Sequence, residues 1–397
     1  METGNLLRGW TLGDGIFLAD GLPLGAEIGR WEAFKRAASK PKRRPVLSVF
    51  IENVGTLTSS VKHVYLRRAI KDSLHEPGHG AGTVTLEDAG GSLITNGRSV
   101  IRRNDKIKIW AGFDNQGFRH GDLVPRFSGV VKDPVINTST GEIRLDVQDY
   151  GYLMKRALTS GDFSGFNTPK LMVNELLDRL NLADAVFENE TGLPTTYILG
   201  NTQLRRRNYW KIANGALLGI GYVFYFDANG DLQCKRRDNS SETLISFRDE
   251  DIKAIVHKRT AELINSKSFE LGNADPVPWS GTVDDSLRWG QGLYAKQHKQ
   301  SQALYGESAD FEDEEMIEGW DNIFPFCRDS VMWFKFPRQV YEMRCAARPF
   351  FELLDKVRID SDIRNIHSQM TIIGLVENIS AQNYSQTLQL LTHRELF

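Results

Sequence analysis

The sequence predicts a mainly β protein in which two antiparallel β-barrel or sandwich domains flank a small α+β domain containing a helical hairpin. Three observations predict this fold class. Apolar and polar residues alternate in short segments toward both ends of the chain, turn-forming residues separate those segments, and the apolar spacing becomes helical in the middle. The expected parts are an N-terminal arm, a first β domain, the α+β domain and a second β domain, over residues 1–45, 46–150, 151–244 and 245–397.

The segment 1–45 is unlike the rest of the chain, because glycine recurs between isolated apolar residues and a basic stretch from Lys35 to Arg44 follows. Glycine raises the entropy of a free chain, so ordering such a segment needs a partner surface. We interpret it as a Gly-rich and basic assembly arm. A solvated tail fits the same composition.

Six segments with one apolar face each predict the strands of the first β domain. Gly, Asn, Asp and Pro occupy the turns between them, and short strands at this density are typical of an antiparallel barrel or sandwich. The segments are 46–51, 61–66, 82–87, 106–110, 126–131 and 142–147.

Two helices and a hairpin are predicted next. Thr168 before Pro169 has the pattern of a helix N-cap followed by proline at the first helical position. A second helix is expected over 209–220, where apolar residues recur at helical spacing. The hairpin follows over 223–234, with its turn at 227–230.

Alternating segments return in the last third of the chain and predict the second β domain. A polar insertion near 275–345 interrupts this domain and is too long for an ordinary loop. The expected strands are 262–272, 356–359, 370–380 and 385–392. The two β domains could be distant duplicates of each other.

Composition and charge narrow the function classes. Hydrophobic residues make up 41% of the 397 residues, enough to bury sizeable cores, and 49 basic against 51 acidic residues leave a formal net charge of -2. A chain without a basic surplus is not built for nonspecific binding to nucleic acid or anionic lipid. The longest nearly apolar stretch, 216–226, falls well short of the roughly 20 residues that a membrane-spanning helix needs.

The first residues show no secretory signal, so we expect folding in a cytoplasm. The three cysteines, Cys234, Cys327 and Cys345, are too few and too scattered for a disulfide framework or a CxxC metal site. We expect reduced thiols that are mostly buried.

A glycine cluster at 78–82 is the one stretch that resembles a nucleotide-binding loop, but it lacks the Lys-Ser/Thr of a P-loop. We interpret it as a turn. His75 and His79 have the spacing of two metal ligands on one helix face, yet Pro77 and Gly78 between them would break any helix.

Asp227, Asn229 and Asp231 copy the first three ligand positions of a calcium-binding loop. Leu232 occupies the place of the required glycine, and Asp238 occupies the twelfth position, where glutamate is expected. A hairpin turn explains these residues with fewer assumptions.

Two runs of carboxylates, at 249–251 and 312–315, are interpreted as solvated surface, because consecutive side chains point in different directions. The basic run 205–207 precedes Tyr209 and Trp210, a mixture found in nucleic-acid readers, but a helix whose aromatic residues pack inward explains it as well. No Gly-x-Ser-x-Gly motif occurs. The sequence therefore predicts no catalytic, cofactor-binding or metal-binding residues.

Three stretches, in this order along the chain, resemble the central hub proteins of phage tails and related contractile injection systems, the family of late-control-protein-D-like hubs. The first runs from Arg126 to Tyr150 and resembles the end of the family's first barrel, and the second runs from Ile212 to Leu232. The third comprises 302–307, with its Tyr-Gly turn, and 351–359. The resemblance covers about residues 46–397.

This resemblance implies two barrels of the tail-tube type and a structural role. Such a hub forms a trimeric ring that joins the sixfold tail tube to the threefold tip or spike and lines the DNA channel. The implied partners are two further copies of the chain, a tail tube or distal tail protein, spike, tip or fibre proteins, and the tape-measure protein. The implied location is the virion tail after assembly in the host cytoplasm, and no active site is implied.

Two other functions remain open from the sequence. A tail-associated carbohydrate-binding adhesin could also have two β domains, with exposed aromatic residues such as Trp279, Trp289 and Trp320. A glycan-degrading enzyme would need a convergent pair of carboxylates, which the sequence does not display.

Overall fold

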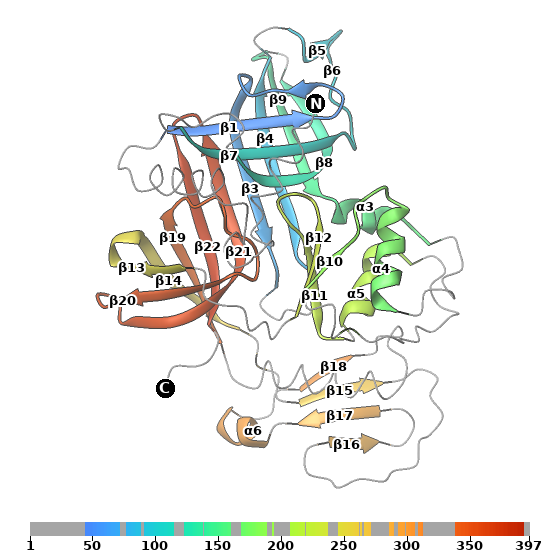
Figure 1. Cartoon of the computed structure of the whole chain (residues 1–397), viewed down its shortest axis with the longest axis vertical. Coiled ribbons are helices and arrows are strands. Elements are labelled where there is room, and N and C mark those ends of the chain that lie inside the picture. Colours follow the sequence, from blue (N-terminus) through green and yellow to red (C-terminus); the bar gives the residue numbers. More distant parts are fainter. Residues whose placement is uncertain are drawn as a thin grey trace, which may run out of the picture.

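A large antiparallel sheet dominates the computed structural model of this chain (Figure 1), which confirms the predicted mainly β fold class. Most of the predicted arm lies outside the residues that the structure describes. These residues are 44–71, 77–88, 91–114, 123–137, 139–159, 168–188, 193, 207–218, 220–236, 245–261, 263, 266–270, 286–289, 293–297, 299–305, 309–312 and 338–392.

Six long strands of this sheet come from the first β region, and we call them the first strand set. They are β1 (Arg44–Ile51), β3 (Val61–Ala69), β4 (His79–Glu87), β7 (Lys106–Asp114), β8 (Val124–Asn137) and β9 (Glu142–Asp149). Each of the six predicted segments lies within one of them. Three two-residue strands accompany them, namely β2 (Gly55–Thr56), β5 (Ile94–Thr95) and β6 (Arg98–Ser99).

Six strands from the last part of the chain form the second strand set. They are β13 (Ile245–Arg248), β14 (Ile252–Thr260), β19 (Gln339–Ala346), β20 (Lys356–Ser361), β21 (Ile366–Ser380) and β22 (Tyr384–Thr392). The short 3₁₀ helix η4 (Asp249–Asp251) joins β13 to β14.

The two strand sets have the same strand order. The first set is ordered β1-β7-β8-β9-β4-β3 and the second β13-β20-β21-β22-β19-β14. Numbered along the chain within each set, both orders read 1-4-5-6-3-2. One pairing differs, since β1 and β7 are antiparallel whereas β13 and β20 are parallel.

Local irregularities recur at the same places in the two sets. Register shifts follow Val61 in β3 and Ile252 in β14. Further shifts follow Val131 in β8 and Ile372 in β21. These two shared bulges align the two sets. Each set also has one shift that the other lacks, between His257 and Arg259 in β14 and between Ile109 and Trp110 in β7.

The loops before β7 and β20 also match. Asn104 and Leu354 have positive φ angles of 70° and 66°. The next residue in each loop, Asp105 or Asp355, accepts a hydrogen bond at 2.8 Å from the backbone N–H three residues earlier. The structure therefore supports an internal duplication, which the sequence left as a possibility.

In its described residues, the α+β unit contains three helices and a small sheet. Its helices are α3 (Gly151–Arg156), α4 (Pro169–Asp178) and α5 (Tyr209–Leu218), and its strands are β10 (Val186–Phe187), β11 (Tyr222–Phe226) and β12 (Leu232–Arg236). Thr168 Oγ1 accepts a hydrogen bond from the backbone N–H of Leu171 at 3.2 Å, so α4 begins at the predicted cap. Among the described residues, no helix is long and apolar enough to cross a membrane.

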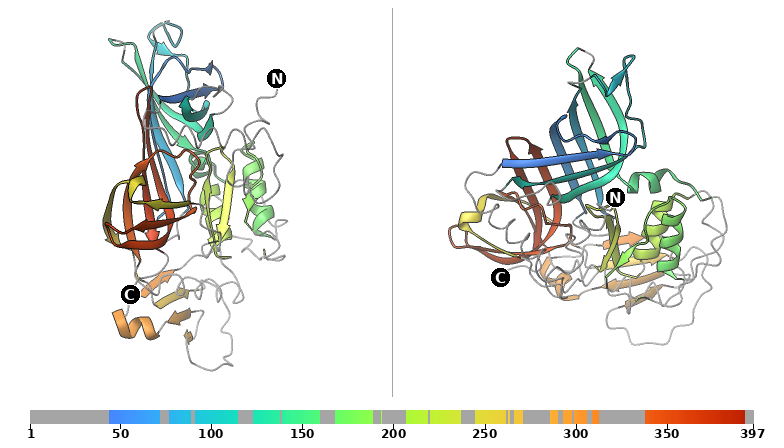
Figure 2. Two further views of the ribbon diagram at one scale, coloured as in Figure 1. Left: turned by 60° about the vertical axis from the view of Figure 1, so that its left-hand side comes forward. Right: turned by 45° about the horizontal axis from the view of Figure 1, so that its top comes forward.

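A separate four-stranded sheet forms between β14 and β19. It contains β15 (Ser266–Glu270), β16 (Ser286–Trp289), β17 (Leu293–Gln297) and β18 (Ala309–Glu312), with the helix α6 (Lys299–Tyr305) between β17 and β18. Figures 1 and 2 show it at one end of the molecule, beyond both the second strand set and the α+β unit.

The prediction that strand 262–272 belongs to the second β domain was therefore wrong in its pairing, because β15 pairs with β17 and β18. The sequence missed β14, which pairs with β19 in the large sheet. The cause is physical: β14 is largely exposed and carries charged residues on both faces, so it shows no apolar alternation.

The strand β11 is buried on both faces and separates two cores. Phe224 and Phe226 pack with the helices of the α+β unit. Val223 and Tyr225, which point the other way, pack with the core of the second strand set. This explains the unbroken apolar run, and it brings the β11–β12 hairpin against both strand sets.

Candidate functional site

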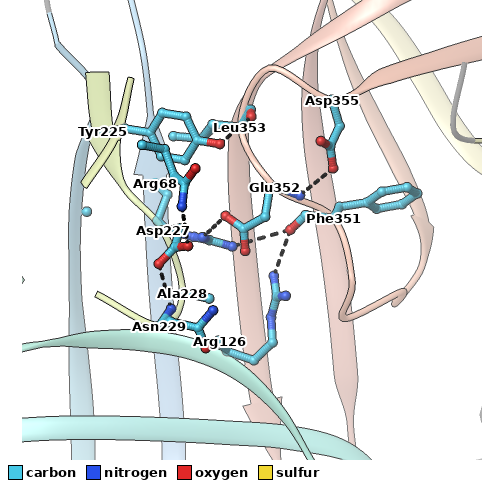
Figure 3. Close-up of polar contacts among 12 residues, drawn as sticks. Arg68, Arg126, Tyr225, Asp227, Ala228, Asn229, Phe351, Glu352, Leu353 and Asp355 are labelled. Atoms are coloured by element: carbon cyan, nitrogen blue, oxygen red, sulfur yellow. Dashed lines mark hydrogen bonds and ion pairs between the residues drawn. The ribbon is translucent and has the colours of Figure 1, made fainter. Parts of the chain in front are cut away.

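A cluster of buried charged and hydroxyl side chains lies where the two strand sets and the β11–β12 hairpin meet, and we call it the junction (Figure 3). The long strands β8 and β21 supply its central ion pair, and the loop before β20 closes it. Because charged groups are costly to bury unpaired, each member of the junction is expected to have a partner.

Arg126 on β8 and Glu377 on β21 form the central pair, and both side chains are 1% exposed. Arg126 Nε donates to the two carboxylate oxygens at 3.1 and 3.2 Å, and Nη2 donates to Oε2 at 2.9 Å. The guanidinium also donates to the carbonyl oxygens of Pro349 and Phe351. One side chain therefore ties the first strand set to the second and to the loop before β20.

Glu377 remains ionised in this setting. Burial opposes its charged form, but Arg126, Arg68 and two hydrogen bonds together keep its pKa below the usual value. Tyr384 Oη donates to Glu377 Oε1 at 2.6 Å, and burial raises the pKa of that hydroxyl well above its usual value. Tyr384 therefore stays protonated and donates.

A second ion pair lies beside the first. Arg68 on β3 pairs with Glu352, and its Nη2 donates to the carbonyl oxygen of Phe351 at 3.4 Å. The backbone N–H of Glu352 donates to Asp355 Oδ2 at 2.8 Å. These contacts fix the loop 351–355 against the first strand set, as Figure 3 shows.

The α+β unit joins the junction through β11 and β12. Tyr225 Oη donates to the carbonyl oxygen of Leu353 at 2.9 Å. Lys235 Nζ lies 4.0 Å from Asp355 Oδ1 and 5.6 Å from the centre of the Tyr225 ring. The loop before β20 is therefore bound from both sides.

The hairpin turn between β11 and β12 is organised by Asp227. Its Oδ1 accepts hydrogen bonds from the backbone N–H groups of Asn229, Gly230 and Asp231 at 2.8, 2.9 and 3.0 Å. Its Oδ2 accepts from Gln233 Nε2 at 2.9 Å. These donors occupy the oxygens that a calcium ion would need, and the residues form the predicted turn, with Gly230 at a φ of 91°.

The junction surrounds only a small cavity. About 20 Å³ is open to the centre of a water molecule, enough for roughly one water. Arg126, Asp227, Lys235, Glu352 and Asp355 are among its lining residues. The junction therefore holds the two strand sets and the β11–β12 hairpin together. Its cavity is too small for a sugar or a nucleotide.

Three buried carboxyls give the fold a predicted pH dependence. Burial raises the pKa of Asp149 to about 7, that of Asp227 to about 7 and that of Asp355 to about 6. Each pKa in the folded chain lies above its value of about 4 in the unfolded chain. At pH values between the two, the folded state therefore binds more protons than the unfolded state. The free energy of unfolding should therefore fall as the pH rises through this window.

Thermal unfolding at about pH 5.5 and about pH 8 checks this, with the lower midpoint expected at the higher pH. Asp227→Asn should reduce this fall in the thermal midpoint, because the amide keeps an oxygen for the three backbone donors but does not ionise. Asp178→Asn, on an exposed position of α4, is the matched control and should leave the fall unchanged. A midpoint that rises between these pH values would contradict the prediction.

The predicted turn at the glycine cluster was wrong, because Gly80 and Gly82 lie inside β4. A Cβ on Gly82 would overlap the carbonyl oxygen of Tyr65 on β3, and the backbone N–H of Gly80 donates to Asp149. The glycines thus permit close backbone approach within the sheet. His79 is exposed on β4, and His75 lies outside the described residues.

The carboxylates 249–251 are not simply solvated surface as predicted, since two of them form ion pairs. Asp249 Oδ1 lies 2.8 Å from Arg364 Nη1, and Asp251 Oδ1 lies 2.5 Å from Arg348 Nη2. A hydrogen bond from Ser361 and the charge of Arg364 lower the pKa of Asp249. Within the part of the chain that the structure describes, no three His, Cys, Asp or Glu residues are grouped to bind a metal.

The remaining predicted residues are placed as follows. Tyr209 on α5 is buried, and Trp210 packs against Phe224 with ring centres 4.8 Å apart, so these aromatics face inward. Cys234 and Cys345 are buried thiols. Outside the described residues lie 205–206, 313–315, Trp279, Trp320 and Cys327.

Sequence reasoning missed the junction. Its visible signals are Arg126, the one charged residue in the buried run 124–131 of β8, and Glu377 in the largely buried β21. Opposite charges at such positions indicate a buried pair, but the pairing itself depends on the fold.

The comparisons with known proteins concern the fold. No protein-family model matches the sequence, and no curated protein matches it. Solved structures do match. The 43 kDa tail protein of prophage MuSo2 from Shewanella oneidensis is 11% identical with a TM-score of 0.58, over 87% of this chain and 98% of that chain.

Two further structures match over most of the chain. The tail protein from Neisseria meningitidis MC58 is 10% identical with a TM-score of 0.59, over 88% of this chain and 96% of that chain. A chain of the half-lidded Francisella PdpA-VgrG complex is 11% identical with a TM-score of 0.52, over 94% of this chain and 63% of that chain. The chain therefore has the fold of phage tail proteins, in agreement with the hub-like resemblance of its sequence.

Proposed function

We propose that this chain is a structural component of a phage tail or baseplate, the central hub that forms a ring of three copies. The observation that carries the proposal is the duplicated strand order, because three chains with two strand sets each supply six similar units. Six similar units match a sixfold tail tube, while the true threefold symmetry of the ring matches a threefold tip or spike. The likeness to tail proteins over most of the chain supports this role.

In this role the ring joins the tail tube to the tail tip, and the phage DNA passes through its lumen. The partners are a tail tube or distal tail protein on one face, spike, tip or fibre proteins on the other, and the tape-measure protein. The arm 1–45 and the insertion near 275–345 contact neighbouring proteins. The ring is assembled in the host cytoplasm and resides in the virion tail.

The proposal assigns no catalytic step to the chain. It is supported by the junction, where Glu377 and Glu352 are held in ion pairs and the cavity has room for about one water. A carbohydrate-binding adhesin or a glycan-degrading enzyme is the competing function. Either would need an open groove, lined by exposed aromatic side chains or by two convergent carboxylates.

Sedimentation of the purified full chain separates these functions. The proposal predicts a particle with three times the 44.9 kDa chain mass at high protein concentration. Its mass should fall on dilution as a reversible trimer dissociates. A chain that stays monomeric at every concentration and binds an oligosaccharide would favour the adhesin or the enzyme instead.

A further inference from the structure

Among the strands that the structure describes, one pair joins the two strand sets within the chain. Residues 374–380 of β21 pair antiparallel with residues 63–69 of β3, from Gly374 opposite Ala69 to Ser380 opposite His63. We call this pairing the internal joint. It buries Val64 and Leu66 on one side and Leu375 and Ile379 on the other.

Each strand set contains the counterparts of both strands of the internal joint. By strand order and by the shared bulges, β14 corresponds to β3 and β8 corresponds to β21. The bulge after Val131 aligns Asp133 with Gly374, so residues 133–137 correspond to residues 374–378. A copy of the joint therefore needs β14 and the second half of β8.

These two counterpart edges have no strand partner in the chain as far as the structure describes it. β14 pairs with β19 on one side only, and residues 133–137 of β8 pair only with β9. In the internal joint, the corresponding edges of β3 and β21 pair with each other.

Side chains on the two unpaired edges are more exposed than those at the corresponding positions of β3 and β21, as expected for a strand edge that lacks a neighbour. Leu66 of β3 is 1% exposed, whereas β14 is exposed from Val256 to Thr260. Leu375 and Glu377 of β21 are each 1% exposed, whereas their counterparts Pro134 and Ile136 of β8 are only partly buried. Val376 is partly buried, whereas its counterpart Val135 is 55% exposed. Val256 is 54% exposed, so both edges leave a large apolar side chain in solvent.

Residue types at the joint are also repeated. Val376 faces Arg67 in the internal joint, and their counterparts are Val135 and Arg259, once the extra shift between His257 and Arg259 in β14 is counted. Asn378 faces Tyr65, and their counterparts are Asn137 and Val256. Pro134 follows the bulge of β8, a position in a strand where a missing N–H is tolerated.

We propose that β14 of one subunit pairs antiparallel with residues 133–137 of β8 in a second copy of this chain, in the register of the internal joint. Arg259 then lies opposite Val135, and Val256 lies opposite Asn137, because the second register shift of β14, between His257 and Arg259, leaves Lys258 without an opposite residue. The contact is head-to-tail. Three copies close the ring, because three internal joints and three such joints between subunits alternate around six strand sets. The inference rests on the ring of the proposed function and assigns the strands that build it.

A cysteine pair tests the register. Asn137→Cys and Val256→Cys are introduced together into the full chain with Cys327→Ser, so that the buried Cys234 and Cys345 are the other thiols left. Directly opposite residues of antiparallel strands have Cα atoms about 4.5–5.5 Å apart, which suits a disulfide. After mild oxidation, chains of the trimer fraction should migrate at two or three times the chain mass in a denaturing gel without reductant.

Two variants control the result. Tyr65→Cys with Asn378→Cys places the same pair in the internal joint, and it should oxidise without a change in mass. Asn137→Cys with His257→Cys moves one cysteine to the opposite face of the strand, so the cross-linked fraction should fall by about tenfold. That fall separates paired strands from chance collisions.

The outcomes of the two proposals are distinguishable. A trimer in which the internal pair oxidises but the Asn137–Val256 pair does not cross-link chains overturns the proposed joint and leaves the ring intact. Equal cross-linking with His257→Cys also overturns the register. A chain that stays monomeric at every concentration, with no cross-link, contradicts the ring itself.

Discussion

Replacing Glu377 with alanine is expected to lower the free energy of unfolding by about 3–5 kcal/mol, because it leaves the buried Arg126 without its counter-ion. Burial disfavours the charged guanidinium, but Glu377, Tyr384 and Glu352 together outweigh this effect and raise the pKa of Arg126. The variant loses this support, but a guanidinium stays protonated in proteins, so the arginine cannot escape the cost by losing its proton. Urea unfolding followed by circular dichroism gives the difference.

Two variants show whether the cost comes from the unpaired charge. Glu142→Ala removes an exposed partner of Lys62 and should cost no more than about 1 kcal/mol. The double variant with Arg126→Met and Glu377→Leu should recover most of the loss, since apolar residues of similar volume often replace a buried pair at little cost. A Glu377→Ala chain as stable as the original would show that the junction does not stabilise the fold.

Replacing Gly129 with alanine is expected to cost more than about 4 kcal/mol, the range reached when backbone elements must separate. A Cβ at this position of β8 would overlap the carbonyl oxygen of Gln148 and approach Asp149 Cα to 2.9 Å, so β8 and β9 would have to move apart. The expected result is loss of soluble, folded protein, measured by expression yield and by the thermal midpoint.

Gly141→Ala is the matched control for this glycine. Nothing lies within 4 Å of a Cβ there, and the φ angle of +68° is the source of strain. Its cost should be about 1–2 kcal/mol, the penalty for an L-residue in the left-handed region. Equal stability of the Gly129→Ala and Gly141→Ala chains would contradict the packing of β8 on β9.

Local patterns in the sequence predicted much of the fold. Alternation predicted the strands of the first set, and Thr168 with Pro169 predicted the start of α4, because these signals act over a few neighbouring residues. The turn at Asp227 was also predictable, since an aspartate with Asn-Gly two residues later favours a hairpin.

Features that depend on distant residues could not be predicted in this way. The strand β14 lacks an apolar face within one chain, and the glycines of β4 are needed for contact with β3 and Asp149, not for a turn. The Arg126–Glu377 pair joins residues 251 positions apart in the sequence. The duplication became evident from strand order and bulges, which persist where few residue identities remain.

Electron-microscope images of the purified particle, viewed along its axis, test the central claim most directly. The ring of three copies predicts six similar lobes around an open channel, with alternate lobes identical, because each chain contributes its first and second strand sets in turn. A single-chain particle, or a closed assembly with two lobes and no channel, would contradict the account.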